Sequence, residues 1–156
     1  RRLRAAATRG TAGCTVKGFL LDTNVLSELR KGARADVNVQ RWFASVDEDL
    51  IFLSVLVTGE IRRGIEAIRK RDPRAAAALE RWLGNLMQAH SDRVLPVDAA
   101  TADEWGKLDV RGSLPVVDGL LAATAQVHDL TFVTRNVKDV VGTGIDVLDP
   151  FAPTTQ

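Results

Sequence analysis

The hydrophobic positions of this chain fall into short apolar runs that alternate with longer amphipathic segments. The apolar runs have the length of buried strands and occupy residues 18–22, 49–54, 93–97, 130–134 and 145–149. The segments between them repeat apolar residues every three or four positions, which is the period of a helix with one buried face. This pattern predicts helices over residues 25–29, 54–68, 72–90, 98–110 and 114–128, and a short turn or helix over 136–140.

The helix after the second apolar run shows the pattern clearly. Ser54 is a suitable N-cap, and apolar residues then recur at positions 57, 61, 65 and 68 as one buried stripe. Glu60 lies beside this stripe. In the helix 98–110 we expect Asp98 to be the N-cap, and we expect His90 and His128 to lie at helix ends, where an imidazole interacts favourably with the helix dipole.

Alternation of strands with helices predicts an α/β fold around a mostly parallel sheet. A chain of 156 residues with 46% hydrophobic residues is long enough to bury one core and short for two. We expect one domain over residues 18–151, preceded by a flexible leader over 1–17 and followed by a short tail over 152–156.

The overall charge is nearly balanced, with 21 lysines and arginines against 20 aspartates and glutamates. Recognition of a nucleic acid would therefore depend on a local basic surface. Cys14 is the single cysteine, which excludes an internal disulfide and fits a reducing cytoplasm. No apolar run approaches the roughly 20 residues that span a bilayer. We expect a cytoplasmic protein.

Acidic residues occur where the predicted strands end and the following helices begin. Asp22 ends the first apolar run, Glu60 lies early in the helix after the second, and Asp118 lies at the start of an alanine-rich helix. Asp139 follows the strand 130–134. In open parallel sheets these positions line one crevice, so the four acids can converge there.

Carboxylates that converge without histidine or cysteine repel one another unless a cation lies between them. Oxygen ligands favour hard ions, so Mg²⁺ is predicted, with Mn²⁺ as an alternative, and zinc is disfavoured. Mg²⁺ keeps several waters and takes one or two carboxylates directly. Hydrolysis of a phosphodiester fits such a site.

Four motifs, in order, are LLDTNVLSELRKG, LSVLVTGEIRRGIE, VVDGLLAATA and TFVTRNVKDV. Together they resemble the PIN-domain ribonucleases, and in particular the VapC-type toxins of bacterial toxin–antitoxin pairs. The resemblance covers about residues 18–151. It implies a three-layer α/β fold and a metal-dependent endoribonuclease that cleaves RNA with an activated water to arrest growth.

The resemblance also implies roles for individual residues. The first three family acids match Asp22, Glu60 and Asp118, with Asp22 and Asp118 as direct metal ligands. Members of the family carry the fourth acid at one of two positions, which here hold Asn136 and Asp139, and the departure at Asn136 leaves the fourth role open between them. The family's hydroxyl and amide positions beside the acids match Thr23, Asn24 and Thr134. These side chains are expected to orient the carboxylates or a phosphate, with simple turn and cap hydrogen bonding as an equal alternative.

Positive charge for a substrate backbone is available beside Glu60. Arg62 and Arg63 are candidate substrate-binding residues within a basic segment over 62–74, with a solvated helix face as the equally weighted alternative. Single-stranded or looped RNA is the expected substrate class, because unstacked strands can enter a crevice that excludes a duplex.

The resemblance implies partners as well. Toxins of this kind are usually homodimers, and a cognate antitoxin inhibits them by laying a segment in a hydrophobic groove beside the acids. Promoter DNA would be bound only indirectly, through the antitoxin. Candidate groove residues, each of which could equally be core, are Leu26, Leu29, Trp42, Phe43, Ile61 and Ile65.

Two alternatives stay open. One is a different PIN-like metal-dependent nuclease, acting in RNA maturation or flap cutting, although such enzymes carry insertions that this sequence lacks. The other is a metal-free, non-catalytic binding module, for which Asn136 is the only support.

Overall fold

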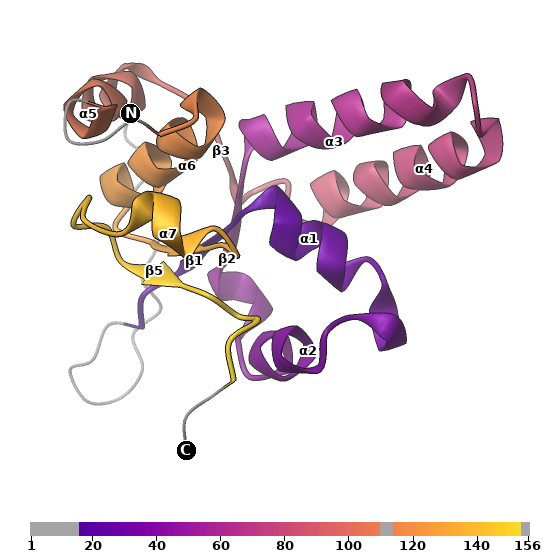
Figure 1. The fold of residues 1–156 in the computed structure, drawn as a ribbon, viewed down its shortest axis with the longest axis horizontal. Helices are drawn as coiled ribbons and strands as arrows, with labels where there is room; N and C mark the ends of the chain where they lie inside the picture. Colours follow the sequence, from indigo (N-terminus) through magenta and orange to yellow (C-terminus); the bar gives the residue numbers. More distant parts are fainter. Residues whose placement is uncertain (1–15, 110–113, 154–156) are drawn as a thin grey trace.

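The computed structural model describes residues 16–109 and 114–153 (Figure 1). The predicted leader lies outside these ranges except for its last two residues, and so does Cys14. The tail is described only as far as residue 153. The division of the chain into leader, domain and tail stays a prediction.

Five short strands form one fully parallel sheet in the order β3-β2-β1-β4-β5 (Figure 1). The strands are β1 (Phe19–Leu21), β2 (Ile51–Ser54), β3 (Val94–Leu95), β4 (Thr131–Val133) and β5 (Val147–Leu148). Each falls within one of the five apolar runs. β1 is central, with Leu20 opposite Phe52 on one side and Phe132 on the other.

Helices cover the sheet in two groups. The first group is α1 (Thr23–Leu29), α2 (Val37–Ala44), α3 (Val55–Arg69) and α4 (Pro73–Ala89), and the second is α5 (Ala99–Asp109), α6 (Val116–Val127) and α7 (Val137–Val140). Two single 3₁₀ turns, Gly32–Arg34 and Glu48–Leu50, flank α2. Figure 1 shows the groups on opposite sides of the strands, as right-handed crossovers require when the chain reverses direction across the sheet. The predicted three-layer α/β fold is confirmed.

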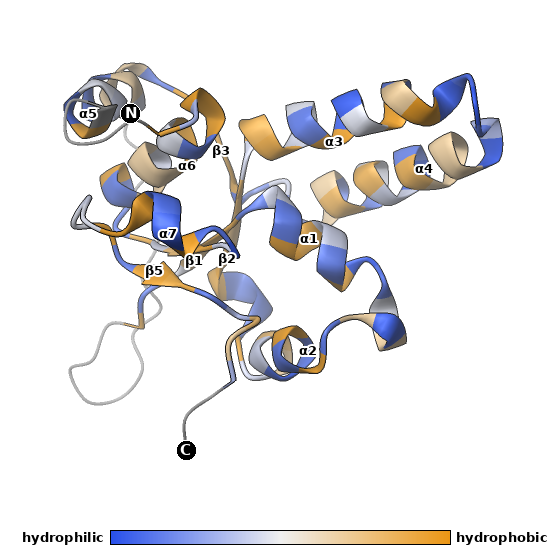
Figure 2. Ribbon diagram, viewed as in Figure 1, coloured by the Kyte–Doolittle hydropathy of each residue, from blue (hydrophilic) through white to orange (hydrophobic). Residues whose placement is uncertain are grey.

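The amphipathic patterns fold as predicted. In α3, Val57, Ile61 and Ile65 are buried, and the hydroxyl of Ser54 accepts a hydrogen bond from the Leu56 N–H as the expected N-cap. Figure 2 shows the polar turn between α3 and α4 at the far end of this helix pair. No helix in the described part of the chain is long and apolar enough to cross a membrane.

Several other helix ends also match their predicted residues. Asp98 accepts a hydrogen bond from the Thr101 N–H at the start of α5. His90 and His128 are the C-caps of α4 and α6.

The strand order creates a reversal point between β1 and β4. From β1 the chain moves to β2 and β3 on one side, and it later returns to β4 and β5 on the other. Ligands bind outside the carboxyl ends of strands at such points. Asp22 follows β1 and Thr134 follows β4, so both lie at this place.

Candidate active site

Asp22 is the most enclosed acid of the site. It is 4% exposed and caps α1, its Oδ1 accepting a hydrogen bond from the Thr23 N–H at 2.7 Å. Its Oδ2 accepts from the Thr134 hydroxyl at 2.6 Å and from the Asn24 amide at 3.0 Å. Its own N–H donates to the carbonyl of Val133 at 2.9 Å. Both carboxylate oxygens are thus fixed by donors from two neighbouring strand ends.

Burial raises the pKa of Asp22 above its usual value. The three hydrogen bonds to its carboxylate act in the opposite direction, and the Glu60 carboxylate raises the pKa further. A nearby cation would stabilise the ionised form of such a carboxylate. A raised pKa is therefore expected of a metal ligand before the metal binds.

Thr134 holds the two strand ends together. Its side chain is fully buried, and besides donating to Asp22 its hydroxyl oxygen accepts from the Asn136 N–H at 3.0 Å and from the Asn24 amide at 3.4 Å. The loop after β4 is therefore tied to the loop after β1 through one hydroxyl group.

Glu60 is brought to Asp22 by α3. The Thr23 hydroxyl donates a hydrogen bond to Glu60 Oε2, although the two residues are 37 positions apart. The charge of Glu60 contributes to the raised pKa of both Asp22 and Asp118. Three predicted acids therefore share one electrostatic environment.

Asp118 lies in the first turn of α6 and is half-buried. Burial raises its pKa, followed by the negative charges of Asp22, Glu60 and Asp139. The next residue is Gly119, where a Cβ atom would lie 3.0 Å from Trp105 of α5. Close packing of α5 on α6 thus depends on a glycine directly beside the acid.

Asn136 and Asp139 both lie after β4, and both are exposed. Asn136 is the N-cap position of α7 without a side-chain capping bond, and Asp139 is within α7. Asp139 is close enough to raise the pKa of Asp118, whereas the hydrogen bond that ties Asn136 to Thr134 comes from its backbone. Which of the two fills the fourth acidic role stays a prediction.

The three polar residues beside the acids all bind acids or each other in this structure. Thr23 contacts Glu60, while Asn24 and Thr134 contact Asp22. Orientation of the carboxylates, one of the roles expected from sequence, is thus observed for each. Their contact with substrate stays a prediction.

The two candidate arginines of α3 differ in their surroundings. Arg62 forms ion pairs with Glu80 of α4 and, at 3.6 Å, with Glu66. Arg63 is exposed. The charge of Arg62 is thus partly neutralised by the α3–α4 pair, and substrate contact by either arginine stays a prediction.

Arg135 lies beside the acid cluster, and the sequence analysis did not single it out. It stands between Thr134 and Asn136, its N–H donates to Asn24 Oδ1 at 3.3 Å, and its guanidinium lies 4.5 Å from the ring centre of Phe151. Its position inside the motif TFVTRNVKDV, adjacent to a predicted site residue, was the available signal.

The donor set fits a hard cation of the Mg²⁺ class. Within the described ranges, no group of three or more His, Cys, Asp or Glu side chains is arranged to hold a metal ion by itself. Mg²⁺ does not require such a cage, because it binds through one or two carboxylates and completes its shell with waters and substrate phosphate. Asp22 and Asp118, both with raised pKa values and mutually repelling charges, are the residues that would hold it.

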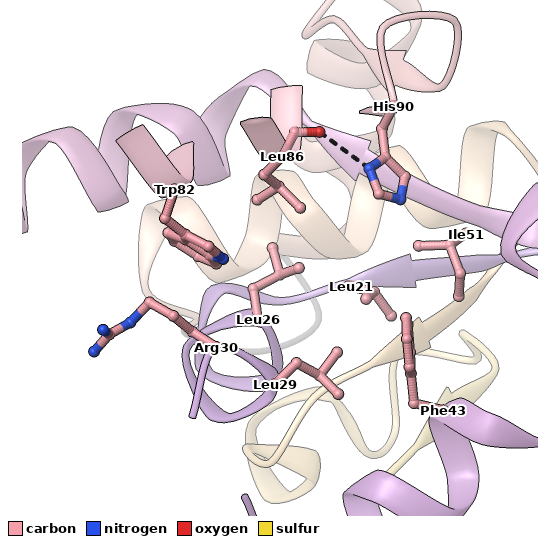
Figure 3. Close-up of a pocket in the computed structure, with 9 residues that line it drawn as sticks. All are labelled: Leu21, Leu26, Leu29, Arg30, Phe43, Ile51, Trp82, Leu86 and His90. Atoms are coloured by element: carbon pink, nitrogen blue, oxygen red, sulfur yellow. Dashed lines mark hydrogen bonds between the residues drawn. The ribbon is translucent and has the colours of Figure 1, made fainter. Parts of the chain in front are cut away.

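An apolar pocket of about 120 Å³ is lined in part by α1, the helix that Asp22 caps. Figure 3 shows its lining, which comes from the end of β1, the start of β2, and helices α1, α2 and α4. The lining residues are Leu21, Leu26, Leu29, Arg30, Phe43, Ile51, Trp82, Leu86 and His90. The Arg30 guanidinium lies 6.0 Å from the Trp82 ring, and His90 Nδ1 hydrogen-bonds the Leu86 carbonyl.

Half of the predicted groove residues line this pocket. Leu26, Leu29 and Phe43 do so. Ile61 and Ile65 are buried in the core instead, and Trp42 packs edge-on against Phe19.

Comparison with known proteins agrees with this architecture. The family model described as "PIN domain" matches residues 19–138. Toxin FitB of Neisseria gonorrhoeae is 28% identical over 138 residues, which cover 85% of this chain and 98% of FitB.

Solved structures share the fold over nearly their whole length. FitAcB from Neisseria gonorrhoeae has a TM-score of 0.66 at 24% identity, covering 85% of this chain and 98% of that one. DNA-bound VapBC from Salmonella typhimurium has a TM-score of 0.65 at 20% identity, covering 86% and 99%. With the four motifs, the parallel sheet and the acids at its reversal point, the family match shows that this chain belongs to the PIN domain family.

Proposed function

We propose that this protein is a Mg²⁺- or Mn²⁺-dependent endoribonuclease and the toxin of a toxin–antitoxin pair. The observation that carries the proposal is the shared environment of Asp22, Glu60 and Asp118. The pKa values of Asp22 and Asp118 are raised by burial and by the charge of Glu60, at the sheet edge where ligands bind, and Asp22 is fixed by three hydrogen bonds.

The residues divide the work of phosphodiester hydrolysis as follows. A bound divalent cation would polarise the phosphoryl group and favour ionisation of the attacking water. Asp22 and Asp118 would hold the cation, with Thr134 and Asn24 fixing the orientation of Asp22. Glu60, held by Thr23, would accept a hydrogen bond from the attacking water and orient it.

The first test separates cleavage from folding. The purified chain should cleave a labelled single-stranded RNA in Mg²⁺ or Mn²⁺ and not in EDTA. Asp22→Asn should abolish cleavage and weaken Mn²⁺ binding in calorimetry, because it removes ligand charge at nearly constant volume. A matched control is Asp103→Asn, an exposed acid of α5 that pairs with Lys107, which should cleave like the unmodified protein. Full RNase activity of Asp22→Asn would refute the assignment.

A second test addresses the fourth acidic role. Asp139→Asn should lower kcat at least about tenfold, since Asp139 carries a charge within range of Asp118, and Asn136→Ala should have a smaller effect. If only Asn136→Ala were impaired, the fourth role would belong to Asn136.

The toxin role is supported by the similarity to FitB and by the fold shared with solved toxin–antitoxin complexes. Induced expression should arrest bacterial growth, and Asp22→Asn should not. The antitoxin is expected to insert apolar side chains into the pocket around Leu29 and Phe43, and it would bring promoter DNA to the complex. A homodimer is expected, and light scattering of the purified protein measures it.

A further inference from the structure

Arg135 is attached to the acid cluster through its backbone. The preceding residue, Thr134, binds Asp22, and the following residue, Asn136, donates its N–H to Thr134. The N–H of Arg135 itself donates to Asn24. The backbone from which the arginine extends is therefore fixed to the residues that orient Asp22.

The side chain of Arg135 is held from the other direction by Phe151. The guanidinium carbon lies 4.5 Å from the ring centre, a distance typical of cation–π stacking. Phe151 is itself anchored, because its N–H donates to Asp149 Oδ1 at 2.9 Å and its carbonyl accepts from the Asn38 amide at 3.0 Å. Stacking restricts the plane of the guanidinium and leaves its N–H edges available.

The guanidinium of Arg135 differs from those of the α3 arginines in its charged neighbours. In the described part of the chain no carboxylate forms an ion pair with it, whereas Arg62 and Arg69 both pair with acids. Glu28 interacts with Arg135 only at longer range, since its carboxylate binds Lys31 and the Asp36 N–H. An exposed and oriented positive charge thus lies at the rim of a negative site.

The same arginine lines a hollow next to the fourth-acid region. Its lining residues are Arg135, Asn136, Val137, Lys138, Asp139 and Asp149. Lys138 adds a second exposed positive charge. The hollow lies near the acid cluster, because the charge of Asp139 in its lining interacts with Asp118. A nucleic-acid strand that enters the acid cluster must bring further phosphates past this rim, where the acids would repel them.

We propose that Arg135, stacked on Phe151, binds the phosphate next to the scissile one in the RNA substrate. This inference rests on the proposed nuclease function and deepens it. A guanidinium matches two phosphate oxygens with parallel N–H groups, and a pre-oriented one loses little freedom on binding. Lys138 contributes a second, less directional attraction.

RNA binding by inactive protein tests the proposal without cleavage. In an Asp22→Asn background, fluorescence anisotropy with a labelled single-stranded RNA is measured over a series of salt concentrations. Arg135→Gln should weaken binding about tenfold or more, and it should reduce the slope of log K against log salt by about one phosphate contact. Arg135→Lys should keep the slope and recover only part of the affinity, because an ammonium cannot stack or bind in the same fork.

Two further variants test whether stacking on Phe151 and the position of the charge account for the effect on RNA binding. Phe151→Leu should weaken binding by a smaller factor with an unchanged salt slope, since the charge is kept and the stacking surface is lost. Arg81→Gln removes one exposed arginine from α4 and is the matched charge control. In otherwise unmodified protein, Arg135→Gln should raise KM more than it lowers kcat.

The outcomes separate this proposal from the nuclease function. If the unmodified protein cleaves RNA, Asp22→Asn does not, and Arg135→Gln binds RNA like Arg81→Gln, the Arg135 proposal is wrong and the nuclease function stands. If the unmodified protein neither binds nor cleaves RNA, both are wrong. Circular dichroism of each variant verifies folding, and Arg135→Lys provides a second reading if Arg135→Gln is unstable.

Discussion

Replacing Thr134 with valine should destabilise the protein by an amount that depends on pH. The substitution keeps the side-chain shape and removes the hydroxyl that donates to Asp22 at 2.6 Å, where both residues are buried. A hydrogen bond to a charged group contributes about 1.5–3 kcal/mol and one to a neutral group about 0.5–1.5 kcal/mol. The Asn136 N–H also loses its acceptor, but Asn136 is exposed and water can replace it.

The pH dependence follows from the direction of the pKa shift. The bond from Thr134 favours ionised Asp22, so its loss raises a pKa that burial already raises. A carboxyl whose pKa is raised by folding stabilises the protein fully below its unfolded-state pKa, and this contribution disappears as pH rises through the folded-state pKa. Thr134→Val should therefore lower the free energy of unfolding by about 1.5–3 kcal/mol at neutral pH. The loss should be smaller in acid, where Asp22 is protonated.

Urea unfolding in EDTA, followed by circular dichroism from about pH 4 to pH 8, measures this deficit. The matched control is Thr124→Val. Thr124 is equally buried, but its hydroxyl donates only to the Leu120 carbonyl within α6. Thr124→Val should therefore lower the free energy of unfolding by the same amount at every pH. Equal pH profiles for the two variants would refute the link between Thr134 and the ionisation of Asp22.

Two more predictions concern packing and partner binding. Gly119→Ala should lower the free energy of unfolding by about 1–3 kcal/mol and reduce cleavage, because the new methyl group meets Trp105, whereas Gly84→Ala in α4 meets nothing and should stabilise by about 0.5–1 kcal/mol. Equal stability of Gly119→Ala and unmodified protein in urea unfolding would contradict the close packing. Leu29→Asp should weaken calorimetric binding of the protein encoded by the neighbouring reading frame at least about tenfold, while the exposed Val37→Asp should bind normally. Normal binding by both would exclude the pocket as the docking site.

The strands and the first acids could be predicted because the signal is local. A buried parallel strand is a short apolar run, and a polar residue at its end, such as Asp22, lies at the sheet edge by geometry alone. Capping by Ser54 and Asp98 was predictable for the same reason, since a cap and its helix are adjacent in sequence.

The pairing of charges across helices could not be predicted in this way. Arg62 meets Glu80 only because α3 and α4 pack side by side, and the choice between substrate contact and an internal ion pair depends on that packing. Arg135 meets Phe151 across α7 and β5, in a contact that no local pattern marks. For Ile61 and Ile65 the structure bears out the core alternative, because a helical stripe does not reveal which of its members faces a pocket.

The central position of β1 has a consequence for protein synthesis. The carboxylate of Asp22 is synthesised before the Thr134 hydroxyl that fixes it, which is 112 residues further along the chain and directly follows β4, the neighbour of β1. A nascent or truncated polypeptide that stops before β4 contains Asp22 but lacks the loop after β4 that holds its carboxylate. Under the proposed function, competence to cleave RNA would therefore arise only after β4 has been synthesised.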